Sequence, residues 1–349
     1  KVFNESLSIK IIDSNVINFD SPKNEPCLKS SILGIITTNR FEQPLLPCSL
    51  LDIQQNSGNQ DHFNQHLLGW IYSEQTPVCC AIRNADIWTP SIEPLAIQQY
   101  ISTNPLKDGD TYLILGGLDG IGYAFSQAIA QSVNCNLILS SANPDYLNDR
   151  QIQSNIKKLQ DLGSNIIPIH VDPSNIDAPI DQLHAFPGPI KGVINSLDMN
   201  VNQHNSLILD TDSALLESQL QDQQTQLEKF AHFIKPLKAQ FCVMMSSLSS
   251  KIGGLGSTVH ACRGNLINAF AGMQTVYSET PWTVINWDRW DESSDREGFS
   301  PEEGMLAFTK ALSLLHVPNF IVATSNPNAR LNSSKGGQSQ AIQDQAEET

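Results

Sequence analysis

The residues of this chain that could do chemistry begin with a glycine-rich turn. An apolar run from Tyr112 to Leu115 leads into Gly116, Gly120 and Gly122, and helical spacing follows. Glycine lets the backbone turn sharply and approach a pyrophosphate closely, and a helix N-terminus favours the negative charge of that group. The pattern indicates the strand, turn and helix start of a dinucleotide-binding unit. A purely structural explanation also stays open, since positive φ angles and close helix–strand packing require glycine too.

The elements that would position this turn alternate between strand and helix from about residue 110. We expect strands over 111–115, 136–140, 165–171, 191–195, 241–245, 283–287 and 319–323. We expect helices over 120–132, 147–162, 212–234, 257–278 and 302–315. This alternation predicts parallel strands joined by right-handed crossovers. The predicted fold class is therefore α/β, with a doubly wound parallel-sheet Rossmann domain.

A smaller α/β unit without a phosphate turn precedes this domain. Its expected strands are 9–12, 32–37, 49–53 and 78–82, and its expected helix is 61–72. We divide the chain into a structural subdomain (1–105), a Rossmann subdomain (106–325) and a flexible tail or linker (326–349). The tail is assigned because its residues are polar and rich in Gln, Ser and Gly.

Composition and charge narrow the possible functions. The formal net charge is −15, from 21 basic and 36 acidic residues. This charge argues against a nucleic-acid-binding protein and against binding to an anionic membrane. No run approaches the roughly 20 apolar residues of a membrane span. The chain starts without Met or signal-peptide organisation, so we expect a segment of a longer, cytoplasmic protein. The seven cysteines are scattered without metal-ligand spacing, so no metal site is expected.

A series of short motifs surrounds the glycine turn. In chain order they are 86–95 (Asp-Ile-Trp-Thr-Pro-Ser-Ile-Glu-Pro-Leu), 171–172 (Val-Asp), 191–194 (Lys-Gly-Val-Ile), 245–250 (Met-Ser-Ser-Leu-Ser-Ser), 253–256 (Gly-Gly-Leu-Gly), 285–287 (Ile-Asn-Trp) and 300–304 (Ser-Pro-Glu-Glu-Gly). In this order and spacing they resemble the ketoreductase (KR) region of a modular type I polyketide synthase, within the short-chain dehydrogenase/reductase superfamily. The resemblance covers nearly the whole chain. It implies that the leading unit is a truncated, Rossmann-like structural subdomain. It also implies that the partners are neighbouring polyketide synthase domains and an acyl-carrier protein.

The resemblance also implies a reaction and its residues. In the family, NADPH reduces the β-carbonyl of a carrier-tethered acyl chain. A Ser binds the carbonyl, a Tyr donates the proton, and a Lys lowers the Tyr pKa. These positions, with a further Asn, fall here on Ser247, His260, Gln223 and Gly264. Only Ser247 matches the family, although Asn265 stands one place late. Because hydride transfer forms an alkoxide, the reaction needs a poised acid and a cation that favours its ionised form.

The cofactor positions implied by the resemblance are changed as well. Four are retained as remnant cofactor-binding residues with weak or lost affinity: Gly116, Gly120, Gly122 and Asp172. Asp119 places a carboxylate where the family usually has Gly, and it would repel a pyrophosphate. Residues 140–143 (Ser-Ser-Ala-Asn) lack the family's Arg for the NADPH 2′-phosphate. Residues 195–198 (Asn-Ser-Leu-Asp) replace a segment of small residues. We therefore expect no bound cofactor.

Two other groups of charged residues are open to interpretation. Arg263 neighbours the site and could bring a positive charge to it, but we expect its side chain to face solvent. Asp288 and Asp291 could form a carboxylate pair, but we expect a solvated loop.

Three hypotheses for function follow. The first is a non-reducing pseudo-ketoreductase domain of a polyketide or mixed polyketide–peptide synthase, with a mainly architectural role. The second is an NADPH-dependent reductase of a carrier-tethered β-ketoacyl thioester that uses Ser247 and His260. The third is a non-catalytic module that binds an acyl-carrier protein or a neighbouring domain.

Overall fold

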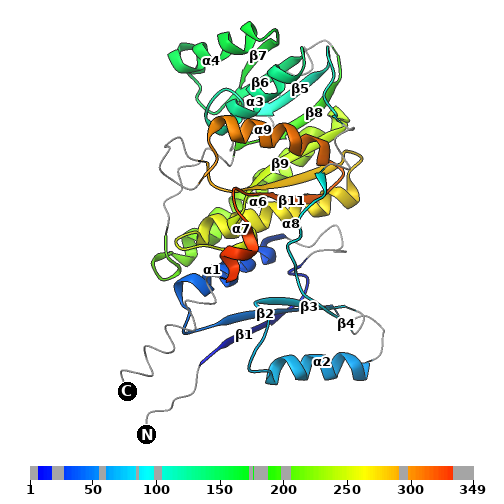
Figure 1. Cartoon of the computed structure of the whole chain (residues 1–349), viewed down its shortest axis with the longest axis vertical. Helices are drawn as coiled ribbons and strands as arrows, with labels where there is room; N and C mark the ends of the chain where they lie inside the picture. Colours follow the sequence, from blue (N-terminus) through cyan, green and yellow to red (C-terminus); the bar gives the residue numbers. More distant parts are fainter. Residues whose placement is uncertain are drawn as a thin grey trace.

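The computed structural model describes residues 7–17, 27–54, 60–83, 86–97, 104–172, 176, 188–197, 206–290 and 298–332. It has two α/β units, a small sheet at one end of the molecule and a large sheet with helices on both faces (Figure 1). Within the described residues, no helix is both long enough and apolar enough to cross a lipid bilayer.

The large sheet has seven parallel strands in the order β7-β6-β5-β8-β9-β10-β11. The strands are β5 (Thr111–Leu115), β6 (Asn136–Ser141), β7 (Asn165–His170), β8 (Ile190–Asn195), β9 (Phe241–Ser247), β10 (Trp282–Trp287) and β11 (Asn319–Val322). The chain reverses its direction across the sheet between β5 and β8, as in a doubly wound Rossmann fold. The fold class predicted from the alternating pattern is therefore confirmed, and each predicted strand of this unit overlaps an observed one.

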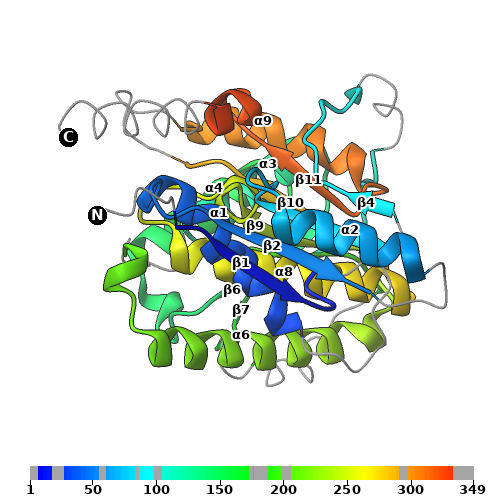
Figure 2. The ribbon, with the colours of Figure 1, turned by 90° about the horizontal axis from the view of Figure 1, so that it is seen from below.

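Helices cover both faces of the large sheet and enclose two apolar cores. One face carries α3 (Gly120–Ser132), α4 (Arg150–Asp161) and α9 (Pro301–Ala311). The other carries α6 (Ser213–Ile234) and α8 (Thr258–Tyr277). Figure 2 shows α6 and α9 on opposite sides of the molecule. Phe125, Trp287 and Phe308 meet in the first core, where the rings of Phe125 and Phe308 lie 4.4 Å apart. These buried aromatic rings fix α3 and α9 against β10.

The small sheet combines parallel β1 (Ile9–Asp13), β2 (Cys48–Ile53) and β3 (Cys79–Arg83) with antiparallel β4 (Asp86–Trp88). Neighbouring residues of β2 point to opposite faces. Leu50 therefore packs toward α1 (Ile32–Glu42), and Leu51 packs toward α2 (Gln60–Tyr72). The unit thus has a helix on each face, as expected for a truncated Rossmann-like subdomain.

The prediction of a strand over residues 32–37 is wrong, because these residues form the first half of α1. The run is rich in β-branched residues, which favour strands locally. Tertiary packing overrides that preference. A Cβ at Gly34 would overlap the backbone of Cys262 on α8, so α1 and α8 approach with almost no space between them. Only a helical segment presents Gly34 to α8 while burying Ile36 against the small sheet.

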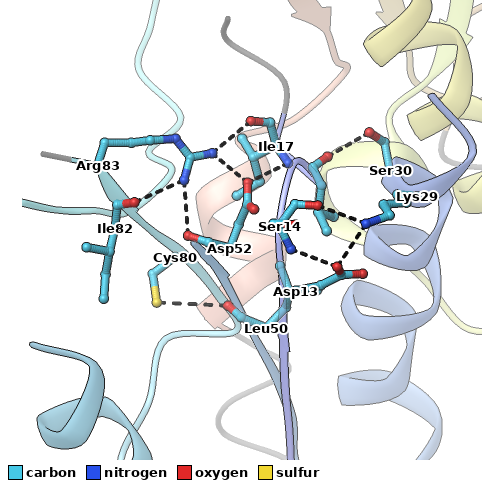
Figure 3. A network of polar contacts seen from close by, with 11 residues as sticks. Asp13, Ser14, Ile17, Lys29, Ser30, Leu50, Asp52, Cys80, Ile82 and Arg83 are labelled. Atoms are coloured by element: carbon cyan, nitrogen blue, oxygen red, sulfur yellow. Dashed lines mark hydrogen bonds and ion pairs between the residues drawn. The ribbon is translucent and has the colours of Figure 1, made fainter. Parts of the chain in front are cut away.

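A buried ion pair holds the strands of the small sheet together (Figure 3). Asp52 is fully buried, and its Oδ2 accepts hydrogen bonds from Arg83 at 2.6 Å and from the amide of Ile17 at 2.8 Å. Arg83 also donates to the carbonyl oxygens of Asp52, Ile82 and Ile17. By contrast, the Lys29–Asp13 pair of the same unit is partly exposed.

The C-terminal end of the described chain is anchored rather than separate. Residues 327–332 are helical. Arg330 forms two hydrogen bonds with the carboxylate of Asp288, the shorter at 2.7 Å, and Asn328 donates to the carbonyl oxygen of Ile92. Asp288 is 8% exposed, so the expectation that it lies in a solvated loop is wrong. Asp291 and residues 333–349 lie outside the described residues, and the flexible tail stays a prediction.

Candidate functional site

The candidate site lies at the carboxyl ends of β5, β8 and β9, where the direction of the sheet reverses. Ligands of doubly wound sheets bind in the crevice at this place. The glycine turn follows β5, Asn195 ends β8, and Ser247 ends β9. The topology therefore gathers motifs that stand far apart in the sequence, from Gly116 to Ser247.

The glycines of the turn are needed for packing. Gly116 and Gly120 have φ angles of 76° and 53°, and residues that carry a side chain rarely adopt such angles. A Cβ at Gly122 would overlap the carbonyl group of Gly116 and the hydroxyl group of Ser196. The turn is further held by Ser140, whose Oγ accepts from the amide of Gly116 at 2.9 Å. The structural explanation of these glycines is therefore sufficient without a bound phosphate.

Asp119 stands at the N-cap position of α3 beside this turn, and its side chain makes no capping hydrogen bond. Its φ of −146° is ordinary extended backbone, so the position does not need a glycine for conformational reasons. The hydroxyl group of Ser141 donates to Asp119 Oδ2 at 3.2 Å. Burial raises the pKa of Asp119, the Ser141 hydrogen bond lowers it and Asp149 raises it further, and the net change is upward. Asp119 is thus a partly desolvated carboxylate at the mouth of the turn. Asp172 is exposed just past the end of β7.

Ser247 and its neighbours form a polar network below the site. Ser247 Oγ lies 2.9 Å from Ser249 Oγ and accepts from the Ser249 amide at 3.2 Å. Ser250 Oγ donates to Asn286 Oδ1 at 2.9 Å, and Asn268 Nδ2 donates to both Ser250 Oγ and Asn286 Oδ1. Asn268 and Asn286 were not predicted as site residues from the sequence. The signal was present, because an Asn inside the apolar strand 285–287 must be buried and hydrogen-bonded.

Gly264 faces this network from α8. A Cβ at this position would lie 2.8 Å from Ser250 Cβ and 3.0 Å from Ser246 Oγ. Asn265 points to the same region, and its Nδ2 donates to the carbonyl oxygens of Ser250 and Ala261. The space that a side chain at 264 would need is therefore already filled by Ser250 and Ser246.

His260 is half-buried in the first turn of α8. Burial and the charge of Arg263 lower its pKa below the ordinary value for histidine. Because that value is about 6.5, the imidazole is mostly neutral at neutral pH. The surroundings of His260 thus disfavour the imidazolium form, which is the form that donates a proton.

Gln223 occupies a cavity of about 280 Å³ between α6, α8 and the end of β8. The side chain is 2% exposed. Neither atom of its amide group has a hydrogen-bond partner among the described residues. Arg263, Asn195 and Leu197 line the same cavity. Arg263 is partly exposed, and the structure brings it and Gln223 to one cavity.

The fold and the site together define a doubly wound domain of the dinucleotide-binding type with an altered active-site crevice. Residues 110–292, more than half of the chain, match the family model of the KR domain. The chain therefore belongs to the KR domain family.

Curated relatives of the chain are modular synthases. It is 26% identical over 267 residues to polyketide synthase PksM of Bacillus subtilis (strain 168), covering 69% of the chain and 6% of that protein. It is 22% identical over 193 residues to erythronolide synthase EryA2 of Saccharopolyspora erythraea, covering 55% of the chain and 5% of that protein. The chain thus spans a small part of the relatives it matches.

Solved structures share the fold across nearly the whole chain. A keto acid-selecting NRPS module with adenylation and ketoreductase domains matches with a TM-score of 0.74 at 17% identity, covering 92% of this chain and 28% of that one. A ketoreductase domain from the bacillaene assembly line matches with a TM-score of 0.71 at 17% identity, covering 93% and 80%. These matches support the predicted pairing of a smaller subdomain with a Rossmann subdomain.

Proposed function

We propose that this KR domain does not reduce a substrate and acts mainly as an architectural part of a polyketide or mixed polyketide–peptide synthase. In this role it holds neighbouring catalytic domains and an acyl-carrier protein at working distances. The relatives support this setting, because they are polyketide synthases many times longer than the chain. The altered crevice supports the loss of reduction.

The observation that carries the proposal is the partial burial of His260 near the charge of Arg263. A nearby cation favours the deprotonated form of any acid. For the Tyr of the resembled family this helps, because a phenol with a pKa near 10 becomes a better proton donor. For His260, burial and, after it, the same charge lower the pKa and so favour the neutral ring over the imidazolium form. A general acid contributes roughly 10²–10⁴ in rate, so a domain without one should turn over negligibly.

The residues around the turn do not fit a dinucleotide phosphate. Asp119 is partly desolvated, so a second negative charge at about 4 Å would raise the free energy by roughly 1–4 kcal/mol. The hydroxyl groups of Ser140 and Ser141 are hydrogen-bonded to Gly116 and Asp119, and no cation stands at 140–143. We therefore derive no step that uses NADPH.

A titration of the chain with NADPH, followed by cofactor fluorescence, tests the proposal. We expect no saturable binding below about 100 μM, which corresponds to about 5.5 kcal/mol. We also expect no NADPH consumption with a β-ketoacyl thioester. Saturable binding together with turnover would establish the alternative, in which Ser247 and His260 reduce the substrate.

The Asp119→Gly variant isolates the contribution of the turn. Removing the carboxylate should strengthen NADPH binding at least about fivefold, the effect of roughly 1 kcal/mol. Asp145→Asn is the matched control, because Asp145 is an exposed carboxylate after the neighbouring strand. Equal effects in the two variants would mean that net charge, rather than the position of Asp119, controls the affinity.

The Gln223 cavity favours a second candidate function, the non-catalytic binding of an acyl group on a carrier protein. A buried amide without a partner is costly, by about 1–3 kcal/mol, unless a ligand completes its hydrogen bonds. A thioester or amide carbonyl of a tethered chain could accept a hydrogen bond from Gln223 Nε2. The cavity also contains the side chain of Arg263.

Titration with acyl-loaded and unloaded carrier protein distinguishes the two functions. If the cavity binds the acyl group, loaded carrier protein should bind more tightly, and Gln223→Met should abolish the difference. Gln226→Met is the control, because Gln226 lines the same cavity and is not among its unpartnered amides. Indistinguishable binding of the two carrier forms would leave the architectural role alone.

A further inference from the structure

A second and larger cavity lies between the two subdomains, bordered on one side by Ser250, Asn265 and Asn268 of the polar network described above. Its volume is about 1390 Å³, above the roughly 300–1,000 Å³ of typical ligand pockets. Its walls come from α1, α8, α9, β11 and the segment 90–97. It shares no lining residue with the Gln223 cavity, so the two are separate sites.

The walls of this cavity are mainly apolar, and several remain exposed. Leu95, Ile97 and Leu306 line it and are 41%, 36% and 59% exposed. Leu33 and Val322 add further apolar surface. Contiguous exposed apolar surface on a folded domain marks a binding groove. An alkyl chain would cover these side chains and remove them from water.

Lys251, on the four-residue helix α7 (Ser249–Ile252), brings a positive charge to this apolar cavity. Among the described residues, no side chain or carbonyl group forms an ion pair or hydrogen bond with its ammonium group. Burial lowers the pKa of Lys251 to about 8. Lys251 is partly buried, so an ammonium group without a counter-ion is costly there, and an anion beside it would offset that cost.

The other charged side chains that line the cavity already have partners or face solvent. The carboxylate of Glu303 accepts from the Ser300 amide in the capping box of α9. Glu93 is exposed and accepts from Ser91. Lys310 is exposed on α9. Lys251 is therefore the group to which a buried anion would bind.

We propose that this cavity binds an amphiphilic carboxylate, with the carboxylate on Lys251 Nζ and an alkyl chain along the apolar walls. The assignment combines the size of the cavity, its apolar walls and Lys251, the one cation of the described lining that is partly buried rather than exposed to solvent. An alkyl ammonium ion would meet a like charge. A neutral alcohol would bury the same apolar surface without the ion pair. The carboxylate is thus the head group that the site favours.

Calorimetric titration of the chain with decanoate, decanol and decylammonium, each below its micelle-forming concentration, tests the proposal. A hydrogen bond to a charged group contributes about 1.5–3 kcal/mol, so decanoate should bind roughly 10- to 100-fold more tightly than decanol. Decylammonium should bind more weakly than either. The Lys251→Met variant should bind decanoate only as tightly as it binds decanol. The Lys310→Met variant should bind all three ligands as the parent chain does. Equal binding of decanoate and decanol, or unchanged decanoate binding in Lys251→Met, would overturn the proposal.

A labelling measurement keeps the proposal testable if Lys251→Met fails to fold. Acetic anhydride modifies neutral amines, and Lys251 has a substantial neutral fraction because of its lowered pKa. Decanoate should slow acetylation of Lys251, read by peptide mass spectrometry, without slowing that of Lys310. Equal protection of both lysines, or of neither, would contradict the proposed site. These results are independent of whether the domain reduces a substrate.

Discussion

The glycine at position 264 provides the sharpest test of how the crevice is packed. Helix α8 carries two glycines in its interior, Gly264 and Gly272. A Cβ at Gly264 would lie 2.8 Å from Ser250 Cβ, whereas a Cβ at Gly272 would meet no atom within 4 Å. Alanine at either position raises the helix propensity by the same amount, but only at 264 does the new methyl group meet a close neighbour. The pair of variants therefore separates the two contributions.

The expected magnitudes follow from these distances. Replacing a helix-interior glycine by alanine stabilises a helix by about 0.8–1 kcal/mol. Overpacking a tightly packed site destabilises the protein by roughly 1–3 kcal/mol. The close atom is Ser250 Cβ, which moves only with its backbone, so this cost is not easily relieved. Gly264→Ala should therefore lower the free energy of unfolding by roughly 0–2 kcal/mol, and Gly272→Ala should raise it by about 0.5–1 kcal/mol.

Urea denaturation and thermal melting of both variants measure this difference. For a domain of 150–250 residues, 1 kcal/mol corresponds to about 2–4 °C in Tm. The two variants should therefore differ by several degrees and in opposite directions from the parent chain. If Gly264→Ala stabilises the chain as much as Gly272→Ala, then the region around Ser250 is not closely packed. The argument that a side chain at 264 is excluded would then fail.

Two further predictions concern the ion pairs that hold the fold together. Arg83→Ala leaves the buried carboxylate of Asp52 without its counter-ion and should destabilise the small subdomain by about 3–5 kcal/mol in urea denaturation. Lys29→Ala removes an exposed pair and should cost less than about 1 kcal/mol, so equal losses would contradict the distinction. At Asp288, burial raises the pKa, but hydrogen bonds led by Arg330 lower it overall. The stabilisation is thus present above the ordinary Asp pKa and is lost as pH falls through the lowered value. Amide protection factors at the C-terminal end, which are corrected for the intrinsic pH dependence of exchange, should therefore stay constant from pH 7 to about pH 4 and fall at lower pH. Arg330→Ala should show the same loss of protection already at pH 7, and protection that is insensitive to both changes would refute this role.

Much of the fold could be predicted because strands and helices of a doubly wound sheet have distinct periods. Buried parallel strands appear as short apolar runs, and helices appear as longer stretches with 3.6-residue spacing. The segment 32–37 shows where this reasoning fails. Its Ile and Thr residues favour a strand locally, but Gly34 must approach the backbone of α8. That contact joins segments more than 200 residues apart in the sequence, so no local pattern reveals it.

The site was less predictable, because spacing shows which positions share a function but not how each side chain is solvated. The family positions of Gln223, His260 and Gly264 could be found from the motifs. The direction of Arg263 and the burial of Asp288 could not. Arg263 lies on a helix with a cavity on one side, and Asp288 is buried by a C-terminal segment that composition alone indicates to be flexible.

The three altered family positions depend on one another, so the proposed function predicts that no single substitution restores reduction. Tyr at 260 would restore the phenol, but the Lys that holds the cofactor in the resembled family would still be missing. Lys at 223 would place an ammonium group in a 280 Å³ cavity that already contains Arg263, and like charges repel. Asn at 264 would collide with Ser250, whose hydroxyl group bonds Asn286. A single substitution would therefore lack a partner residue, face a like charge or overlap with an atom that now fills the space. We expect all three single variants to remain inactive, and turnover by any one of them would show that the crevice has kept a working geometry.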